Sequence, residues 1–173
     1  LDMSAIENDK LRIRHDPFDI KQILNGIAGM YYPQCCEKKV RFEMQTVGLS
    51  SEQLMGDQLR VNQILLNLVS NACKFTPEGG MICVRTEQIA RQERRVRLRF
   101  TISDTGCGMT PEMLQRVFEP FEQESARTAQ EHGGSGLGLS IARSLAERMQ
   151  GSIRCQSEKG KGTIFTVDLP FDL

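Results

Sequence analysis

The chain has 173 residues, a length typical of one domain with its own apolar core. Its 22 Lys and Arg residues balance 22 Asp and Glu residues, and this zero net charge excludes a general electrostatic attraction to nucleic acid or acidic membranes. No apolar run approaches the roughly 20 residues that span a bilayer, and no signal peptide opens the chain. We therefore expect a soluble, cytoplasmic fragment.

The six cysteines form no CxxC pair, and three of them lie inside apolar helix or strand patterns. We expect buried free thiols of a reducing compartment rather than a disulfide framework.

The N-terminal part predicts a linker, a helix and a strand. The linker ends in Leu11–Arg14, which alternates like a short strand. Asp19 can cap the following helix, and Gln22 stands three residues after it, as in a capping box. We expect this helix to end by Pro33. Apolar and polar residues then alternate over residues 40–45, which predicts a strand with one face in the core.

The middle of the chain predicts a long helix followed by a hairpin. After a loop over residues 49–56, the longest helical pattern runs from Asp57 to Phe75. A turn at residues 77–80 leads into two strands, near Met81–Glu87 and Val96–Ser103.

Arginines are concentrated at the link of this hairpin and on its second strand. They alternate with apolar residues, and no stacking aromatics accompany them, so we predict a solvated strand face rather than a nucleic-acid surface. The residues are Arg91, Arg94, Arg95, Arg97 and Arg99.

The C-terminal part predicts a short helix, a long loop, a second helix and a hairpin. Thr110 can cap a helix that runs to about Val117. Residues 119–136 are polar and aperiodic, which is typical of a functional or disordered loop. A helix closed by Gly151 precedes two final strands, near residues 153–155 and 164–169. The predicted fold is an α/β (α+β) two-layer sandwich: a mixed, largely antiparallel sheet covered on one face by helices.

The long helix carries a second, polar stripe opposite its apolar one. Arg60, Gln63, Asn67, Asn71 and Lys74 recur at spacings of three and four, so they share one line of the helix. Asparagine is a poor helix former, and its carboxamide oxygen suits Mg²⁺, while a lysine one turn on can reach a phosphate. Both a metal–phosphate face and an ordinary polar helix face remain open at this point.

Two glycine-rich segments follow. Asp104–Met109 places a carboxylate at the end of an apolar strand, where the amine of adenine can donate to it and the carbonyl of guanine cannot; an ordinary turn is the alternative. Gly133–Leu139 runs into a helix, whose backbone N–H groups favour an anion. It is neither a P-loop nor a dinucleotide fingerprint, because Gly-Lys-Ser/Thr and a βαβ unit are missing.

In chain order, four segments resemble the boxes of the ATP-binding domain of sensor histidine kinases, within the wider family of gyrase, heat-shock chaperones and mismatch-repair ATPases. They are the N box Asn67–Phe75, the first glycine box Asp104–Met109, the F box Phe118–Phe121 and the second glycine box Gly134–Leu139. The resemblance implies a Bergerat fold, with ATP and Mg²⁺ as ligands and with residues 119–136 as the ATP lid.

The resemblance also implies roles at the phosphate end of the site. Asn71 would supply an oxygen to Mg²⁺, Asn67 would support the same phosphate cluster, and Lys74 would contact phosphate, so that Asn67 and Lys74 are the candidate catalytic residues. The related ATPases have a glutamate at the position of Asn67. Since an amide cannot take a proton from water, we expect slow ATP hydrolysis.

At the base end, the resemblance places Phe75 beside the adenine, Asp104 on its amine, and Thr163 near Asp104, where it helps to hold a water on the base. The remaining candidate ATP-binding residues are Gly106, Gly108, Met109, Ser135, Gly136, Leu137, Gly138 and Leu139.

By the same resemblance, residues 1–14 are the end of a dimerisation helix with its linker, and residues 15–173 are the catalytic domain. His15 and His132 do not match the phosphoacceptor box. The expected partners are therefore a dimerisation/phosphoacceptor domain absent from this chain and the receiver domain of a response regulator, with no nucleic acid. We expect a monomeric fragment of a homodimeric parent.

Two alternatives remain beside a protein-histidine kinase that donates the γ-phosphoryl group of ATP. One is an ATPase or chaperone-like nucleotide switch of the wider family that hydrolyses ATP itself. The other is a non-enzymatic module that docks a receiver domain without binding nucleotide.

Overall fold

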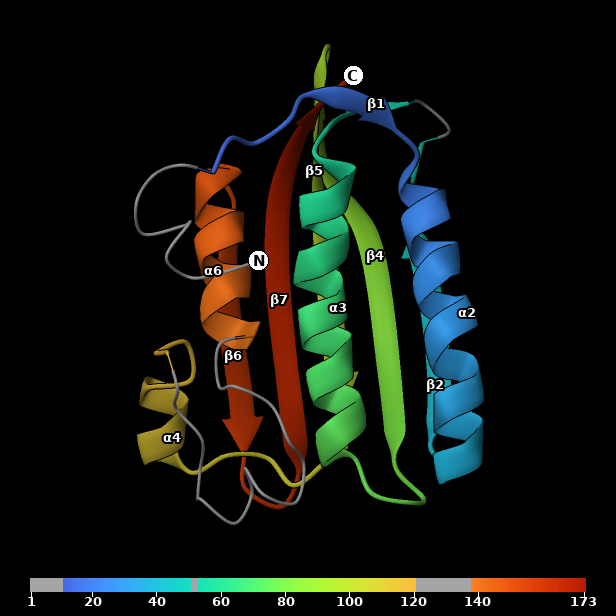
Figure 1. Cartoon of the computed structure of the whole chain (residues 1–173), viewed down its shortest axis with the longest axis vertical. Helices are drawn as coiled ribbons and strands as arrows, with labels where there is room; N and C mark the ends of the chain where they lie inside the picture. The colour runs from blue at the N-terminus through green and yellow to red at the C-terminus, as the bar shows by residue number, and fades with distance from the viewer. Residues whose placement is uncertain (1–10, 51–52, 121–137) are drawn as a thin grey trace.

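The computed structural model describes residues 11–50, 53–120 and 138–173, and these form a sheet covered by helices (Figure 1). The strands are β1 (Asp16–Phe18), β2 (Arg41–Val47), β3 (Leu54–Gly56), β4 (Met81–Gln92), β5 (Arg95–Asp104), β6 (Ser152–Glu158) and β7 (Gly162–Asp172). The helices are α2 (Ile20–Lys38), α3 (Gln58–Phe75), α4 (Pro111–Gln115) and α6 (Gly138–Arg148).

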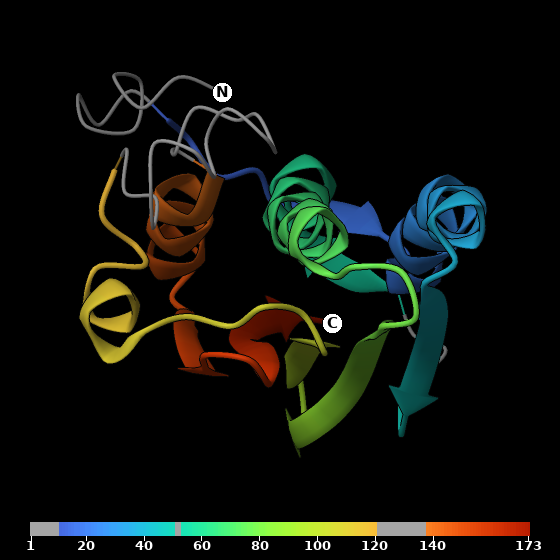
Figure 2. The same ribbon diagram turned by 90° about the horizontal axis from the view of Figure 1, so that it is seen from below.

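The described strands make one seven-stranded sheet in the order β1-β3-β7-β5-β4-β2, with β6 paired to β7 beside this path. Neighbouring strands run antiparallel except β2 and β4, which are parallel. Seen from below, α2, α3 and α6 lie side by side on one face of the sheet (Figure 2). The structure thus confirms the two-layer sandwich with a mixed, largely antiparallel sheet.

The core lies between this helical layer and the sheet. Every second residue of β5, from Val96 to Ile102, is buried, and so is the apolar stripe of α3. The intervening residues Arg95, Arg97 and Arg99 lie on the open face, as the predicted solvated strand face requires. Polar contacts on that face can therefore form away from the helices.

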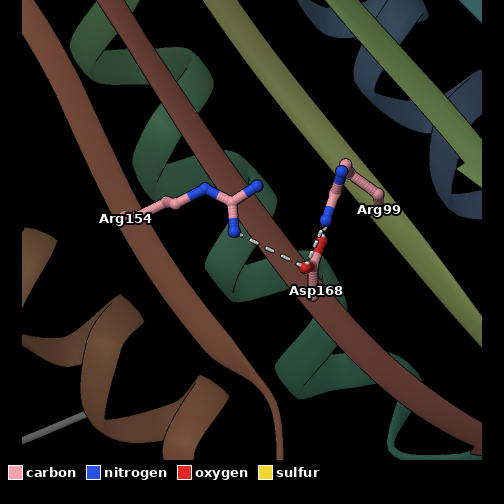
Figure 3. A network of polar contacts seen from close by, with 3 residues as sticks. All are labelled: Arg99, Arg154 and Asp168. Carbon is pink, nitrogen blue, oxygen red and sulfur yellow. Dashed lines mark hydrogen bonds and ion pairs between the residues drawn. The ribbon is translucent and has the colours of Figure 1, made fainter. Parts of the chain in front are cut away.

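One such contact is a buried carboxylate held between arginines (Figure 3). Arg99 of β5 donates two hydrogen bonds, both of 2.8 Å, to the two carboxylate oxygens of Asp168 on β7. A nitrogen of Arg154 on β6 lies 3.8 Å from the same carboxylate. Chiefly because of the hydrogen bonds from Arg99, the pKa of Asp168 is lowered. The network joins three neighbouring strands.

Helix α2 contradicts the prediction that it would end by Pro33, since it continues to Lys38. Pro33 lacks the N–H that would bond the carbonyl of Gly29, and both residues are exposed, so water can satisfy that carbonyl. Tyr31 and Cys35 on the opposite face are buried in the core. Packing of this face outweighs the missing hydrogen bond.

The region on either side of α2 also differs from the prediction. Residues 11–14 form no strand, and the first strand is Asp16–Phe18 instead. The predicted loop over residues 49–56 contains β3, which pairs with β1 and, through Met55 and Asp172, with the end of β7. Such short strands depend on partners distant in sequence, which alternation alone does not reveal.

The remaining described elements confirm the predictions. Helix α3 is capped by Asp57, whose carboxylate accepts from the backbone N–H of Arg60 (3.2 Å) and from that of Arg14 (2.9 Å). The hairpin β4–β5, helices α4 and α6 and the strands β6 and β7 all form, although β4 continues beyond the predicted Glu87 to Gln92 and so includes Arg91. The predicted lid lies almost entirely outside the described residues, as do residues 1–10 of the predicted end of a dimerisation helix and its linker.

The six cysteines are all free. The expectation that they are buried holds fully only for Cys35, because Cys36 and Cys107 are exposed and the other three are half-buried. Among the described residues, no helix combines the length and apolar character that a bilayer crossing requires.

Candidate functional site

The polar stripe of α3 is directly joined to the start of α6. Asn67 Nδ2 donates a hydrogen bond of 3.0 Å to the backbone carbonyl of Gly138, across 71 residues of sequence. Asn67 and Asn71 are half-buried, and Lys74 at the next turn is exposed. Because the carboxamide nitrogen of Asn67 is used as the donor, its oxygen remains available to accept.

The carbonyl end of α3 is held by a residue that sequence reasoning missed. Lys38, the last residue of α2, donates from Nζ to the backbone carbonyl of Cys73 (2.5 Å) and to that of Lys74 (3.4 Å). A cation at a helix C-terminus satisfies carbonyls that have no partner within the helix and complements the dipole. A lysine ending a helix is a common pattern, so only the packing of α2 against α3 reveals this role.

Asp104 ends β5 with its carboxylate half-buried. Its Oδ1 accepts a hydrogen bond of 2.8 Å from the backbone N–H of Gly106. Burial raises the pKa of Asp104, while hydrogen bonds from the backbone of Gly106 and Thr163 act in the opposite direction. Asp104 is paired with Thr163 across β5 and β7, so both side chains lie on the same face of the sheet.

The first glycine segment lies against the backbone of other elements. The N–H of Cys107 donates to the carbonyl of Phe75 at the end of α3 (3.3 Å). A Cβ on Gly106 would lie 2.4 Å from that same carbonyl oxygen. Gly108 has a φ of +66°, and a Cβ there would lie 2.0 Å from the carbonyl oxygen of Glu158. Only glycine fits at these two positions. Because both residues lack a Cβ, the first glycine segment can pack against both α3 and β6.

The far side of this segment is fixed by Ser157 on β6, which the sequence analysis did not identify. Ser157 Oγ accepts from the backbone N–H of Met109 (2.9 Å), contacts the carbonyl oxygen of Gly162 (2.9 Å) and lies 2.9 Å from Thr163 Oγ1. A serine in a strand near a turn carries no local signal of such a role. Its partners come from two different stretches of the chain, the first glycine segment and the start of β7.

Gly138 and Leu139 form the first turn of α6, whereas Ser135, Gly136 and Leu137 lie outside the described residues. In the F box, the Phe118 ring packs edge-on against Phe165, with ring centroids 6.1 Å apart. The guanidinium of Arg143 on α6 lies 5.5 Å from the centre of the Phe118 ring. The F box is thus attached to α6 and to the sheet.

A pocket of about 500 Å³ lies elsewhere, next to the first residues of α3. Its lining includes Phe18, Ile23, Gln58 and Asn62, and it contains no predicted site residue. Several of the predicted residues lie instead on or against the second half of α3. Asn67 reaches the second glycine segment there, and Phe75 reaches the first.

The sequence profile of the histidine kinase-, DNA gyrase B-, and HSP90-like ATPases matches residues 56–173. The chain belongs to this family. It is 42% identical over 173 residues to the autoinducer 2 sensor kinase/phosphatase LuxQ of Vibrio vulnificus (strain YJ016), covering 99% of this chain and 20% of LuxQ. The chain thus spans about one fifth of the length of the first curated relatives it matches.

Solved structures of histidine kinases share the fold of this ATPase-family domain. Full-length ShkA in complex with AMPPNP matches with a TM-score of 0.76 at 32% identity, over 94% of this chain and 32% of ShkA. Histidine kinase ThkA in complex with response regulator protein TrrA matches with a TM-score of 0.71 at 22% identity, over 97% of this chain and 45% of that chain. The chain is an ATP-binding catalytic domain of the sensor histidine kinase type.

Proposed function

We propose that this domain binds Mg²⁺-ATP along the second half of α3 and donates the γ-phosphoryl group to a histidine on a separate dimerisation domain. The observation that carries the proposal is that α3 contacts both glycine segments. Asn67 holds the carbonyl of Gly138 (3.0 Å), and the carbonyl of Phe75 accepts from Cys107 (3.3 Å). A nucleotide lying along this helix would have its phosphates at the first contact and its base at the second.

The base end is suited to adenine. The carboxylate of Asp104 can accept from an exocyclic amine, whereas the carbonyl of guanine at that position would leave it unpaired. Thr163 is paired with Asp104 across β5 and β7, and these two residues form the corner at which the base would be read. Phe75 lies beside this corner, because its carbonyl accepts from the N–H of Cys107. Gly106 and Gly108 let the backbone pack closely against Phe75 and Glu158, and this places the segment, with Met109, beside the proposed base position. Asp104 is therefore the proposed adenine-reading residue.

The phosphate end has a donor set that fits Mg²⁺. Asn71 and Asn67 offer neutral carboxamide oxygens, and the described residues contain no group of three or more His, Cys, Asp or Glu that could hold a metal by themselves. Mg²⁺ commonly takes few protein ligands and completes its shell with water and phosphate oxygens. We assign Asn71 as the ligand and Asn67 as its support, and the ion would neutralise phosphate charge there.

The remaining residues position the phosphates and do not activate water. Lys74 is exposed one turn beyond Asn71, where its ammonium can reach a phosphate as a point charge. The backbone N–H groups at the start of α6, with Gly138 and Leu139, favour an anion at the helix N-terminus. Since Asn67 cannot act as a base, positioning and charge neutralisation are the contributions of this domain to phosphoryl transfer.

The proposed phosphoryl acceptor is a histidine of a separate domain and not His15. Nε2 of His15 is 3.5 Å from Asp172, at the end of β7 opposite Thr163. At about 3.3 Å per residue, the strand separates the two ends by roughly 30 Å. His15 is therefore remote from the base-reading corner. The proposed partners are a dimerisation/phosphoacceptor domain and, by analogy with ThkA, the receiver domain of a response regulator.

Titration of the chain with fluorescent ATP, with and without Mg²⁺, tests the nucleotide site. We expect binding that Mg²⁺ strengthens and that Asp104→Asn weakens, while the matched exposed variant Glu112→Gln does not. Binding that is absent, or indifferent to Asp104→Asn, would overturn the proposal.

Transfer of label from [γ-³²P]ATP to a supplied dimerisation domain tests the reaction itself. We expect transfer that Lys74→Ala impairs and that Lys21→Ala, on the exposed side of α2, does not. Rapid ATP turnover by the chain alone, abolished by Lys74→Ala, would favour the ATPase alternative over a kinase.

A further inference from the structure

Ser157 on β6 lies where the first glycine segment meets the start of β7. Its hydroxyl oxygen lies 2.9 Å from the backbone nitrogen of Met109, 2.9 Å from the carbonyl oxygen of Gly162 and 2.9 Å from Thr163 Oγ1. Met109 belongs to the first glycine segment, while Gly162 and Thr163 begin β7. A single oxygen thus connects the glycine segment to the strand that carries Thr163.

The direction of each hydrogen bond follows from the number of protons. A serine hydroxyl has one proton and two lone pairs, a carbonyl only accepts, and a backbone N–H only donates. The Ser157 hydroxyl therefore donates its proton to the carbonyl of Gly162, and one of its lone pairs accepts from the N–H of Met109. The remaining lone pair faces Thr163, so the Thr163 hydroxyl must be the donor in that contact. The proton of Thr163 is held by Ser157.

This assignment decides what Thr163 can offer to a ligand. Thr163 is 7% exposed, and its side chain lies on the same face of the sheet as its cross-strand partner Asp104. With its proton held by Ser157, Thr163 Oγ1 presents only lone pairs. The carboxylate of Asp104 beside it also only accepts, and it already receives the N–H of Gly106 (2.8 Å). The side chains at this corner are acceptors alone.

We propose that Ser157 is a specificity-determining positioning residue, which excludes guanine by keeping the Thr163 hydroxyl from acting as a donor. The inference rests on the proposed nucleotide site. Adenine brings an amine to this corner, directly or through a water, and acceptors satisfy it. Guanine brings a carbonyl that needs a donor, and a freely rotating Thr163 hydroxyl would supply one.

The test compares ATP and GTP as competitors of a fluorescent ATP analogue on the 173-residue chain, in Mg²⁺ buffer. In Ser157→Ala, the Thr163 hydroxyl is free to donate, and we expect the ratio of ATP to GTP affinity to fall about tenfold, the equivalent of one hydrogen bond. Gln156→Ala, at the exposed neighbouring position of β6, should leave the ratio unchanged.

The same comparison in a Thr163→Val variant distinguishes control of the Thr163 hydroxyl from simple support of the first glycine segment. In Thr163→Val, adding Ser157→Ala should not change the ATP-to-GTP ratio further, because the hydroxyl through which Ser157 acts is gone. If Ser157→Ala does not fold, Ser157→Cys carries the same expectation, since a thiol is a weak acceptor of similar size.

Equal weakening of ATP and GTP by these Ser157 variants would show that the serine only supports the loop, and would overturn the proposal. So would a ratio that falls equally in the Thr163→Val background. A wild-type chain that binds neither nucleotide would contradict the proposed function itself, and this inference with it.

Discussion

Asn67 on α3 donates a 3.0 Å hydrogen bond to the backbone carbonyl of Gly138, the first residue of α6. The bond joins the two proposed phosphate-binding segments without any charged group. It needs a donor at position 67, which a carboxylate in the place of the amide does not provide. An asparagine here therefore serves both the attachment of α6 and the proposed metal–phosphate cluster.

Asn67→Asp should weaken Mg²⁺-ATP binding about tenfold or more, because a carboxylate would face the Gly138 carbonyl with no proton to donate. The same change should lower the free energy of unfolding by about 1–3 kcal/mol. Calorimetric titration and urea unfolding measure the two effects. Asn25→Asp, on the exposed face of α2, is the matched control. Unchanged binding would contradict a role of this bond in the site.

Asp104→Asn should lose ATP binding and yet raise the free energy of unfolding at neutral pH, by about 0.5–2 kcal/mol as is common for active-site polar groups. The raised pKa of Asp104 means that burial disfavours its charged form. The folded chain then holds this proton more tightly than the unfolded chain, so the wild-type carboxylate costs stability at neutral pH.

The destabilisation by the wild-type carboxylate should disappear as the pH falls through the raised pKa of Asp104. The excess in free energy of unfolding of Asp104→Asn over wild type should therefore shrink on acidification from pH 7 towards about 4. Urea unfolding at several pH values measures this difference. An advantage that grows on acidification would show that Asp104 is stabilised as a carboxylate, contrary to the direction of its pKa.

Arg99→Ala should destabilise the chain by about 1–3 kcal/mol, because it removes both hydrogen bonds to the buried carboxylate of Asp168. Arg97→Ala, on the same strand face and acting on Asp168 through charge, should cost less than about 0.5 kcal/mol. Thermal and urea unfolding at pH 7 provide the comparison. Equal effects of the two variants would contradict the importance of the paired hydrogen bonds.

The contribution of the Arg99–Asp168 pair to stability depends on pH with the opposite sign to that of Asp104. The pKa of Asp168 is lowered in the folded chain, so its contribution is present above the ordinary carboxyl pKa and is lost as the pH falls through the lowered value. The stability difference between wild type and Arg99→Ala should therefore narrow below about pH 4. A constant difference down to pH 2 would contradict this assignment.

Alkylation at pH 8 should modify Cys36 and Cys107 first, because both are exposed. Burial raises the pKa of Cys35 to about 11 and that of Cys155 to about 12, and the thiolate is the reactive form. Mass spectrometry after timed iodoacetamide treatment measures the order. Early modification of Cys155, which lies near Asp104, would show that the base-reading corner is open to solvent.

The sequence predicted most of the fold because the relevant signals are local. Helix α3 shows its apolar stripe and its capping Asp57, and the hairpin β4–β5 shows alternation in β5 and in the first half of β4. The positions of Asn67, Asn71 and Asp104 on these elements followed from the same patterns. Pro33 misled the prediction because the packing of α2 outweighs one local hydrogen bond.

By itself, the sequence determined which residues are proposed to carry the chemistry: the carboxamides and lysine of one helix, the aspartate at a strand end and the glycines beside it. Only the tertiary structure decided how these groups are held, through the Lys38 contact with the end of α3 and the Ser157 contact with Met109. The periodicity of a sequence indicates only the helix or strand to which each residue belongs. The partner of a hydrogen bond between elements depends on strand register and helix packing, which arise only when the whole chain is folded.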